Sequence, residues 1–306
     1  MNKNIRQEFA DLMLELGSKD KKLLVLVGDI SHGILQPFRR KFPNRYFNIG
    51  ICEPSMVNMG AGLSKSGLNP VVHTIAPFIT ERAFEQIKLD FGYQKLGINL
   101  ITVGGSFDYA NLGCSHHCYT DVSLLSHFKD SSVVIPGTAE EFKILFKKIY
   151  KQKNIKYFKI PSISHGVNFG AKKIIFGKCI KVANGKDITI VTTGTQLRNV
   201  IEASKALNEI GCSVEILYYH TLKPFDAISL RKSLSKTKRL LTVEELFSHG
   251  GLYDRAIKTC VEIPIKTKQM AVFDFIHGYG SYSDLCNKTG LNVSSIIKQA
   301  KKLVKK

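Results

Sequence analysis

Short apolar strands alternate with amphipathic helices along this chain, and that alternation constrains the fold more than any other feature. Residues 22–30 (KLLVLVGDI) predict a buried strand, and further strands are predicted for residues 69–79 (NPVVHTIAPFI), 98–105 (INLITVGG) and 187–194 (DITIVTTG). Apolar residues at helical spacing fill the segments between them, as in residues 81–97 and 138–153. Strands that alternate with helices favour mostly parallel sheets covered on both faces.

A polar, glycine-containing stretch, residues 162–173 (SISHGVNFGAKK), interrupts the alternation and predicts a linker. A chain of 306 residues is long enough for two separate cores. We therefore predict two doubly wound α/β domains, residues 1–165 with a mostly parallel sheet and a smaller domain at residues 166–306.

One acid stands where a strand gives way to a helix, in residues 45–67 (RYFNIGICEPSMVNMGAGLSKSG). Pro54 suits the first turn of a helix, so Glu53 falls at or next to the N-cap. Gly67 suits the left-handed residue that follows the helix. Glu53 has two interpretations at this point: a ligand group at the strand tip, or a cap favoured by the helix dipole.

Other polar and aromatic residues also follow predicted strands. Asp29, Phe78 and the loop 114–118 (CSHHC) all do so, and His73 lies near the end of its strand. Ligand groups in parallel sheets gather beyond the carboxyl ends of the strands. One sheet edge could therefore collect these residues together with Glu53.

Charge and cysteine content exclude several classes of protein. The net charge is +19, but the lysines are scattered and no aromatic-interleaved basic motif appears, so nucleic-acid binding is not favoured. The first residues lack a signal peptide pattern and no apolar run could span a bilayer, so we expect a cytoplasmic protein. The CSHHC loop has no second ligand pair, which argues against a zinc site.

Six segments, in order, resemble the C-terminal half of transketolases, especially the small subunit of the split enzymes. They are NIGICEPSMVNMGAGLSKSG, HTIAPFITERAFEQI, GCSHHCYTDVSLL, VTTGTQLRNVIEASKALNEIG, YYHTLKPFD and TVEELFSHGGL. The resemblance implies a pyrimidine-binding domain followed by a transketolase C-terminal domain. It also implies an enzyme that transfers a two-carbon ketol unit between sugars or sugar derivatives.

The resemblance assigns roles to individual residues. Glu53 would hydrogen-bond the aminopyrimidine of thiamine diphosphate and so promote the tautomer that generates the reactive carbanion. Phe78 would stack on the pyrimidine, and Asp29 would lie near the cofactor. His116 would contact substrate oxygens and assist proton transfer. The expected substrate-binding residues are His116, Asn111 and His73, and His220 is expected to be structural.

The family motif for Mg²⁺ and diphosphate, Gly-Asp-Gly with a downstream Asn, is not matched, since Gly28-Asp29-Ile30 lacks the second glycine. We expect a separate N-terminal transketolase-like subunit to bind Mg²⁺ and the diphosphate, in an α2β2 assembly that shares the cofactor. No metal ligand is expected in this chain.

The substrate end of the sequence departs from ordinary transketolases. Asn111 and Leu112 replace a Glu-Asp pair, and Gly104 replaces a histidine. Ser162 stands where an arginine often binds the substrate phosphate, with only Lys159 nearby, and lysine does not reproduce a bidentate arginine. We hypothesise a modified donor or acceptor, unphosphorylated or carried on a nucleotide.

Three alternatives stay open. The chain could be the beta subunit of a 2-oxo acid dehydrogenase, or part of an enzyme resembling deoxyxylulose-phosphate synthase; both use an oxo-acid donor. It could also be a non-catalytic scaffold subunit.

Overall fold

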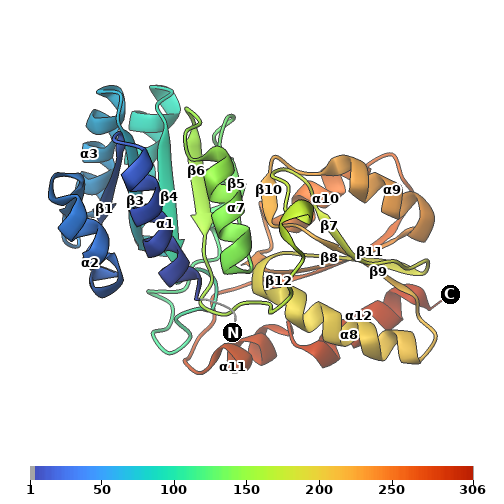
Figure 1. Ribbon diagram of the computed structural model, residues 1–306. Helices are drawn as coiled ribbons and strands as arrows, with labels where there is room; N and C mark the ends of the chain where they lie inside the picture. Colours follow the sequence, from blue (N-terminus) through green and yellow to red (C-terminus); the bar gives the residue numbers. More distant parts are fainter. Residues whose placement is uncertain (1–3, 306) are drawn as a thin grey trace.

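The computed structural model describes residues 4–305, which form two α/β units side by side (Figure 1). The larger unit contains a seven-stranded sheet of order β10-β5-β6-β4-β3-β1-β2, parallel except for the pairing of β10 with β5. Its strands are β1 (Leu23–Val27), β2 (Tyr46–Asn48), β3 (Asn69–Ile75), β4 (Ile98–Val103), β5 (Ser132–Val134), β6 (Ile155–Lys159) and β10 (Thr221–Lys223).

Helices cover both faces of this sheet. On one face, α1 packs against α2 and α7, and Phe9 of α1 meets Phe142 of α7 edge to face. On the other face, α3 packs against β3 and η2. The elements are α1 (Ile5–Lys19), α2 (His32–Lys41), η1 (Pro43–Arg45), α3 (Glu53–Lys65), α4 (Ala76–Thr80), α5 (Phe84–Gln86), the π-helix η2 (Ile87–Tyr93), α6 (Asp121–Ser126) and α7 (Ala139–Ile149).

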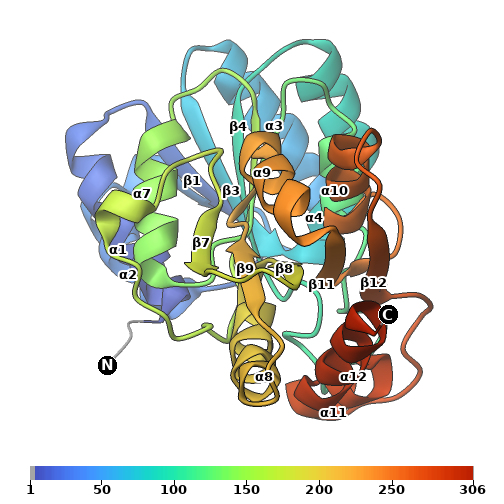
Figure 2. The ribbon, with the colours of Figure 1, turned by 90° about the vertical axis from the view of Figure 1, so that its right-hand side faces the viewer.

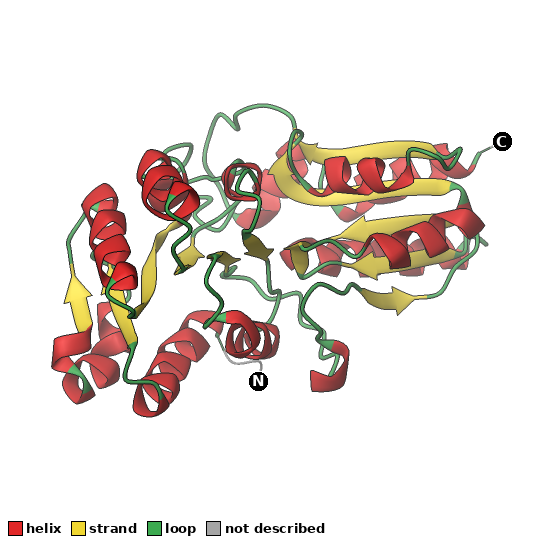
Figure 3. Ribbon diagram, turned by 90° about the horizontal axis from the view of Figure 1, so that it is seen from above, coloured by secondary structure: helices red, strands yellow, loops and turns green. Residues whose placement is uncertain are grey.

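The second unit contains a five-stranded sheet of order β12-β11-β8-β9-β7, in which only β7 is antiparallel to its neighbour. Figure 2 shows this sheet between its helices, with α8 and α12 on one face and α9 and α10 on the other. Figure 3 shows both units from above. The elements are η3 (Ala171–Lys173), β7 (Ile180–Ala183), β8 (Ile188–Thr192), η4 (Gly194–Gln196), α8 (Leu197–Glu209), β9 (Val214–Tyr218), α9 (Ala227–Thr237), β11 (Arg239–Phe247), α10 (Leu252–Cys260), β12 (Lys266–Val272), α11 (Tyr282–Thr289) and α12 (Val293–Val304).

The predicted fold class, two mostly parallel α/β units, is confirmed. None of the helices in residues 4–305 combines the length and apolar character needed to cross a membrane. The domain boundary at residue 165 stays a prediction.

Two predicted elements are wrong in detail. The strand predicted for residues 69–79 ends at Ile75, because the Ala76-Pro77 pair starts α4 there, and proline favours the first turn of a helix. The helix predicted for residues 81–97 is divided between the short α5 and the π-helix η2. Phe78 therefore lies on a short helix beyond the sheet edge rather than on the strand.

A buried polar cluster links the two units. Glu141 of α7 accepts hydrogen bonds at Oε2 from the Tyr218 hydroxyl at 2.8 Å and from the Gly137 N–H at 2.7 Å. The Nε2 of His165, in the predicted linker, lies 2.9 Å from Glu141 Oε1. All four residues are buried, so the carboxylate is well satisfied by partners from the turn before α7, the linker and β9.

This cluster makes a first prediction. Tyr218→Phe leaves Glu141 with one fewer donor, so we expect the free energy of unfolding to fall by about 1–2 kcal/mol. Urea unfolding followed by circular dichroism measures the change. Tyr93→Phe, at a side chain that is 84% exposed, is the matched control and should be neutral. Equal stability of the Tyr218 variant and the control would contradict the role of the cluster.

Candidate active site

Glu53 is the first residue of α3, and Cys52 is the N-cap, without a capping side-chain hydrogen bond. The Glu53 carboxylate turns away from the helix. Its Oε2 accepts a hydrogen bond from Arg82 Nη1 at 2.9 Å, and its Oε1 accepts one from the Thr74 hydroxyl at 3.3 Å. Glu53 is 1% exposed. The expected position beside the N-cap is confirmed, but the side chain does not act as a cap.

Burying this carboxylate is costly, and Arg82 and Thr74 offset the cost by pairing with its two oxygens. Arg82 also lies over the ring of Phe78, with 4.4 Å between the guanidinium carbon and the ring centroid. A cation over a ring face is attracted by the π-electrons. The short segment after β3 therefore brings an aromatic ring and a cation to the acid.

The end of β1 approaches Glu53 closely. A Cβ on Gly28 would stand 3.0 Å from Thr74 Oγ1 and 3.4 Å from Glu53 Oε1, so any side chain there would crowd the acid. Asp29 follows with a φ of 52°. Its Oδ1 lies 3.1 Å from Asn48 Nδ2 and 2.9 Å from His32 Nε2, and these contacts lower the pKa of the Asp29 carboxyl. Asp29 is thus an exposed carboxylate at the same edge as Glu53.

His116 is half-buried on the loop after β4 and faces Phe78. The two ring centroids are 5.3 Å apart at 72°, and the ring of Tyr109 stands 6.0 Å away on edge. The Nδ1 of His116 lies 3.0 Å from the Ser115 hydroxyl. Among the described residues, its Nε2 has no hydrogen-bond partner. The loop therefore presents an imidazole nitrogen beside Phe78.

The second unit holds the His116 loop in place. The Ser106 hydroxyl donates to the Glu245 carbonyl at 2.8 Å, and the Phe247 N–H donates to the Tyr119 carbonyl at 3.0 Å. Gly113, with a φ of 74°, is covered by Tyr279; a Cβ there would stand 2.5 Å from the tyrosine ring. The loop conformation thus depends on β11 and on the segment after β12.

His73 lies behind this edge. It is fully buried, with Nδ1 3.0 Å from the Ile101 carbonyl and Nε2 2.8 Å from the Ser31 hydroxyl. Burial lowers its pKa to about 4. Arg6 donates to the same hydroxyl at 2.9 Å, so a chain of hydrogen bonds runs from Arg6 through Ser31 to His73. The side chain of His73 does not reach the surface, and a direct substrate contact stays a prediction without structural support.

Lys159 is buried under the His116 loop. Its Nζ lies 3.0 Å from Asp121 Oδ2 and donates to the Cys118 carbonyl at 3.3 Å, while the Tyr157 hydroxyl donates to Asp121. Lys159 is therefore not free to bind a substrate. Asn111 is exposed at the loop tip, and Ser162 donates its N–H to Asp108 Oδ2 at 3.0 Å.

The described residues contain no group of three or more His, Cys, Asp or Glu side chains that could hold a metal ion. In the CSHHC loop, Cys114 is exposed while His117 and Cys118 are buried.

Two family models match this chain, one for each half of the sequence. The transketolase pyrimidine-binding domain matches residues 2–162, and the transketolase C-terminal domain matches residues 177–296. The chain belongs to the transketolase family. The resemblance predicted from the sequence is confirmed, and the family uses thiamine diphosphate.

Relatives span the whole chain. One of the subunits of the apulose-4-phosphate transketolase of Phocaeicola vulgatus is 28% identical, covering 98% of this chain and 97% of that protein. The 6-deoxy-6-sulfo-D-fructose transketolase subunit SqwH of a Clostridium species is 26% identical, covering 97% and 93%. A solved split-gene transketolase, described as an inactive beta4 tetramer, has a TM-score of 0.89 at 28% identity and covers 98% of both chains. The expected transketolase-like transferase subunit is thus confirmed.

The deoxyxylulose-phosphate synthase alternative is weaker. The synthase of Halothermothrix orenii is 26% identical over 97% of this chain, but the match covers only 48% of that protein.

Sequence reasoning missed Arg82 as a partner of Glu53 and gave no role to Thr74. The sequence predicts a continuous helix over residues 81–97, and on such a helix Arg82 cannot be distinguished from other charged residues at the surface. The signal that could have found it is the proline two residues after Ile75, which ends the strand and redirects the chain toward Glu53.

Asp108, on the same loop as His116, should make the stability of the protein depend on pH. Burial raises the pKa of Asp108 from 3.8 to about 7, and the Ser162 N–H only partly opposes this. The folded protein then holds this proton more tightly than the unfolded chain. The free energy of unfolding is therefore highest, as far as Asp108 is concerned, below pH 3.8, and it falls as the pH rises to about 7.

Asp108→Asn should remove that loss, leaving the protein more stable than wild type at pH 8 by more than about 1 kcal/mol. Denaturant unfolding between pH 4 and 8 measures it. Glu262→Gln, at an exposed carboxylate, is the control and should keep the wild-type slope. A parallel pH dependence in the Asp108 variant and wild type would contradict the buried proton.

Proposed function

We propose that this chain supplies the pyrimidine-side half of a transketolase active site and that Glu53 binds the cofactor. The proposed reaction transfers a two-carbon ketol unit between sugars or sugar derivatives. The buried Glu53 carboxylate at the carboxyl edge of the sheet, beside Phe78 and His116, is the observation that carries the proposal.

The residues at this edge fit the pyrimidine half of thiamine diphosphate. Glu53 offers a fixed carboxylate to a ring nitrogen, and the half-exposed Phe78 offers an aromatic face. Gly28 leaves the space next to the acid free of a side chain. When bound, the cofactor supplies the electron sink that stabilises a two-carbon carbanion.

The side chains of this protein orient the reacting groups and carry protons. Glu53 would hold a proton toward the ring nitrogen of the bound cofactor, and Arg82 keeps the carboxylate oriented through its bond to Oε2. His116 presents Nε2 towards the space beside Phe78, where it can hold or transfer a proton at a substrate hydroxyl. Asp29 completes the polar edge next to the cofactor.

A partner subunit is needed to complete the site. Residues 4–305 offer no cluster of metal ligands, and the sequence lacks the Gly-Asp-Gly motif, so Mg²⁺ and the diphosphate would be bound by an N-terminal transketolase-like subunit. Ile51, Leu112 and Tyr279 are 68%, 43% and 69% exposed near Glu53 and the His116 loop. Exposed apolar side chains that border a site favour a protein interface, and we propose an α2β2 assembly.

The substrate end of the site favours a sugar with an anionic group. Arg6 lines a cavity of about 420 Å³ together with Gln7 and Ser31, and its buried Nε has no hydrogen-bond partner among the described residues. Arg6 Nη2 donates to the Ser31 hydroxyl at 2.9 Å, and Ser31 follows Asp29 by two residues, so Arg6 lies near the sheet edge that carries Asp29.

Arg6 could therefore replace the arginine that other transketolases often have at the position of Ser162. The two relatives named above act on a sugar phosphate and a sulfonated sugar, both of which carry an anionic end. We therefore favour a phosphorylated or sulfonated substrate over a neutral one.

The central test replaces the cofactor acid. Glu53→Gln keeps the shape but cannot exchange a proton, so turnover of the reconstituted two-subunit enzyme should fall by about 100-fold or more. Ketol transfer is measured with saturating thiamine diphosphate and Mg²⁺, and thermal melting checks folding. Glu85→Gln, at an exposed acid, is the control.

Three outcomes would contradict the proposal. Unchanged turnover would remove Glu53 from the mechanism, and tight binding of thiamine diphosphate and Mg²⁺ by the chain alone would exclude the split site. Efficient turnover of pyruvate in place of a ketose donor would favour the oxo-acid alternatives.

A second test addresses the substrate. Arg6→Gln removes the cation from the cavity, so the KM for an anionic sugar should rise about tenfold while that for a neutral ketose stays unchanged. Arg40→Gln, at an exposed position on α2, is the matched control. An equal change for both sugars would show that Arg6 does not recognise the anionic group.

A further inference from the structure

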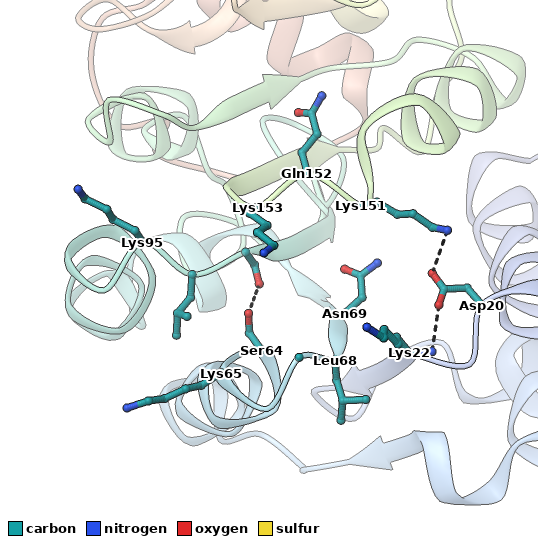
Figure 4. A pocket seen from close by; sticks show the side chains of 13 residues that line it. Asp20, Lys22, Ser64, Lys65, Leu68, Asn69, Lys95, Lys151, Gln152 and Lys153 are labelled. Carbon is teal, nitrogen blue, oxygen red and sulfur yellow. Dashed lines mark hydrogen bonds and ion pairs between the residues drawn. The ribbon is translucent and has the colours of Figure 1, made fainter.

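A groove of about 720 Å³ opens at the amino end of the larger sheet (Figure 4). It lies opposite the edge that carries Glu53, because Asn69 in the groove begins β3 and Thr74 lies near the other end of that strand. The loops before β1, β3, β4 and β6 form its walls. The lining lysines come from these loops and from the end of α3; they are Lys22, Lys65, Lys95, Lys151 and Lys153.

These lysines have little negative charge beside them. Asp20 is the one acid among the lining residues. Its Oδ1 accepts the Lys22 N–H at 3.0 Å, and its Oδ2 lies 3.7 Å from Lys151 Nζ. The other four lysines have no ion pair with any residue between 4 and 305. Asp20 therefore neutralises one charge of the five.

Backbone acceptors near the groove are also occupied. Buried Lys156 donates to the Gln152 and Asn154 carbonyls, and Arg45 donates to the Gly17, Asp20 and Leu23 carbonyls. These carbonyl oxygens would otherwise repel an anion. In contrast, the Asn69 Nδ2 is a buried donor without an acceptor in the described structure.

The carboxyl ends of nearby helices offset only part of this positive charge. α1, α3, α7 and η2 end at this edge, and each helix end carries about half a negative charge. After these ends and Asp20 are counted, a surplus of about two positive charges remains. Figure 4 shows Lys22, Lys153 and Asn69 in the middle of the groove, with Lys65 and Lys95 pointing away at its rim.

We propose that this groove binds a small polyanion of the polyphosphate class, either free or as the phosphate tail of a nucleotide. Several ammonium groups from separate loops suit an anion with charges spread over several oxygens. The Asn69 amide supplies a donor in the middle, and Leu68 and Leu96 offer an apolar wall for a base. The site is at the opposite end of the strands from Glu53 and does not depend on the proposed activity.

Isothermal titration of the full chain with sodium tripolyphosphate tests the proposal. Lys22→Gln/Lys153→Gln should weaken binding by about tenfold or more, and raising the salt should weaken it further. Lys172→Gln/Lys173→Gln, at exposed lysines on η3, should bind like wild type. Thermal melting checks folding. If the first pair unfolds, Lys65→Gln/Lys95→Gln at the rim replaces it, with a smaller loss expected.

Titration with ATP separates the two sources of the ligand. Binding about tenfold tighter than that of tripolyphosphate assigns a nucleotide tail, and equal or weaker binding assigns a free polyphosphate. The proposal is overturned if tripolyphosphate shows no saturable binding at low salt. It is also overturned if the groove variant keeps wild-type affinity, or if the η3 control loses as much.

Discussion

The pairing of the buried Glu53 carboxylate with Arg82 is the contact on which the site depends. A carboxylate that is 1% exposed needs partners for both oxygens, and Thr74 and Arg82 provide them. Arg82 can reach Glu53 because β3 stops at Ile75 and the chain turns into α4. That same turn exposes Phe78 under the guanidinium. One ion pair thus fixes the acid, the aromatic ring and the path of the chain between them.

The second α/β unit positions the other half of the site. It contributes no side chain near Glu53 in the part of the chain that the structure describes, yet β11 bonds to the loop that carries His116, and Tyr279 covers Gly113 of that loop. Contacts between the two units therefore hold the polar groups of this loop in place. These contacts restrain a loop whose glycine and polar residues give it little hydrophobic packing of its own.

The sequence predicted the two α/β units, the start of α3, and the gathering of Asp29, Glu53 and His116 at one edge. These predictions rest on local rules: apolar alternation, proline at a helix start, and the carboxyl ends of parallel strands. It did not predict that Glu53 pairs with Arg82 or that His73 is buried, because both depend on packing between distant segments. The π-helix η2 was also missed, since its apolar spacing resembles that of an ordinary helix.

The short strand β10 has a consequence for how the chain can be divided. It belongs to the second half of the sequence, yet it pairs with β5 at the edge of the larger sheet. A fragment that ended at the linker would leave the polar backbone groups of β5 open to other chains, as an unprotected sheet edge. The two halves share this sheet, and each of the two hydrophobic clusters contains residues of both halves, so neither half is an independent module.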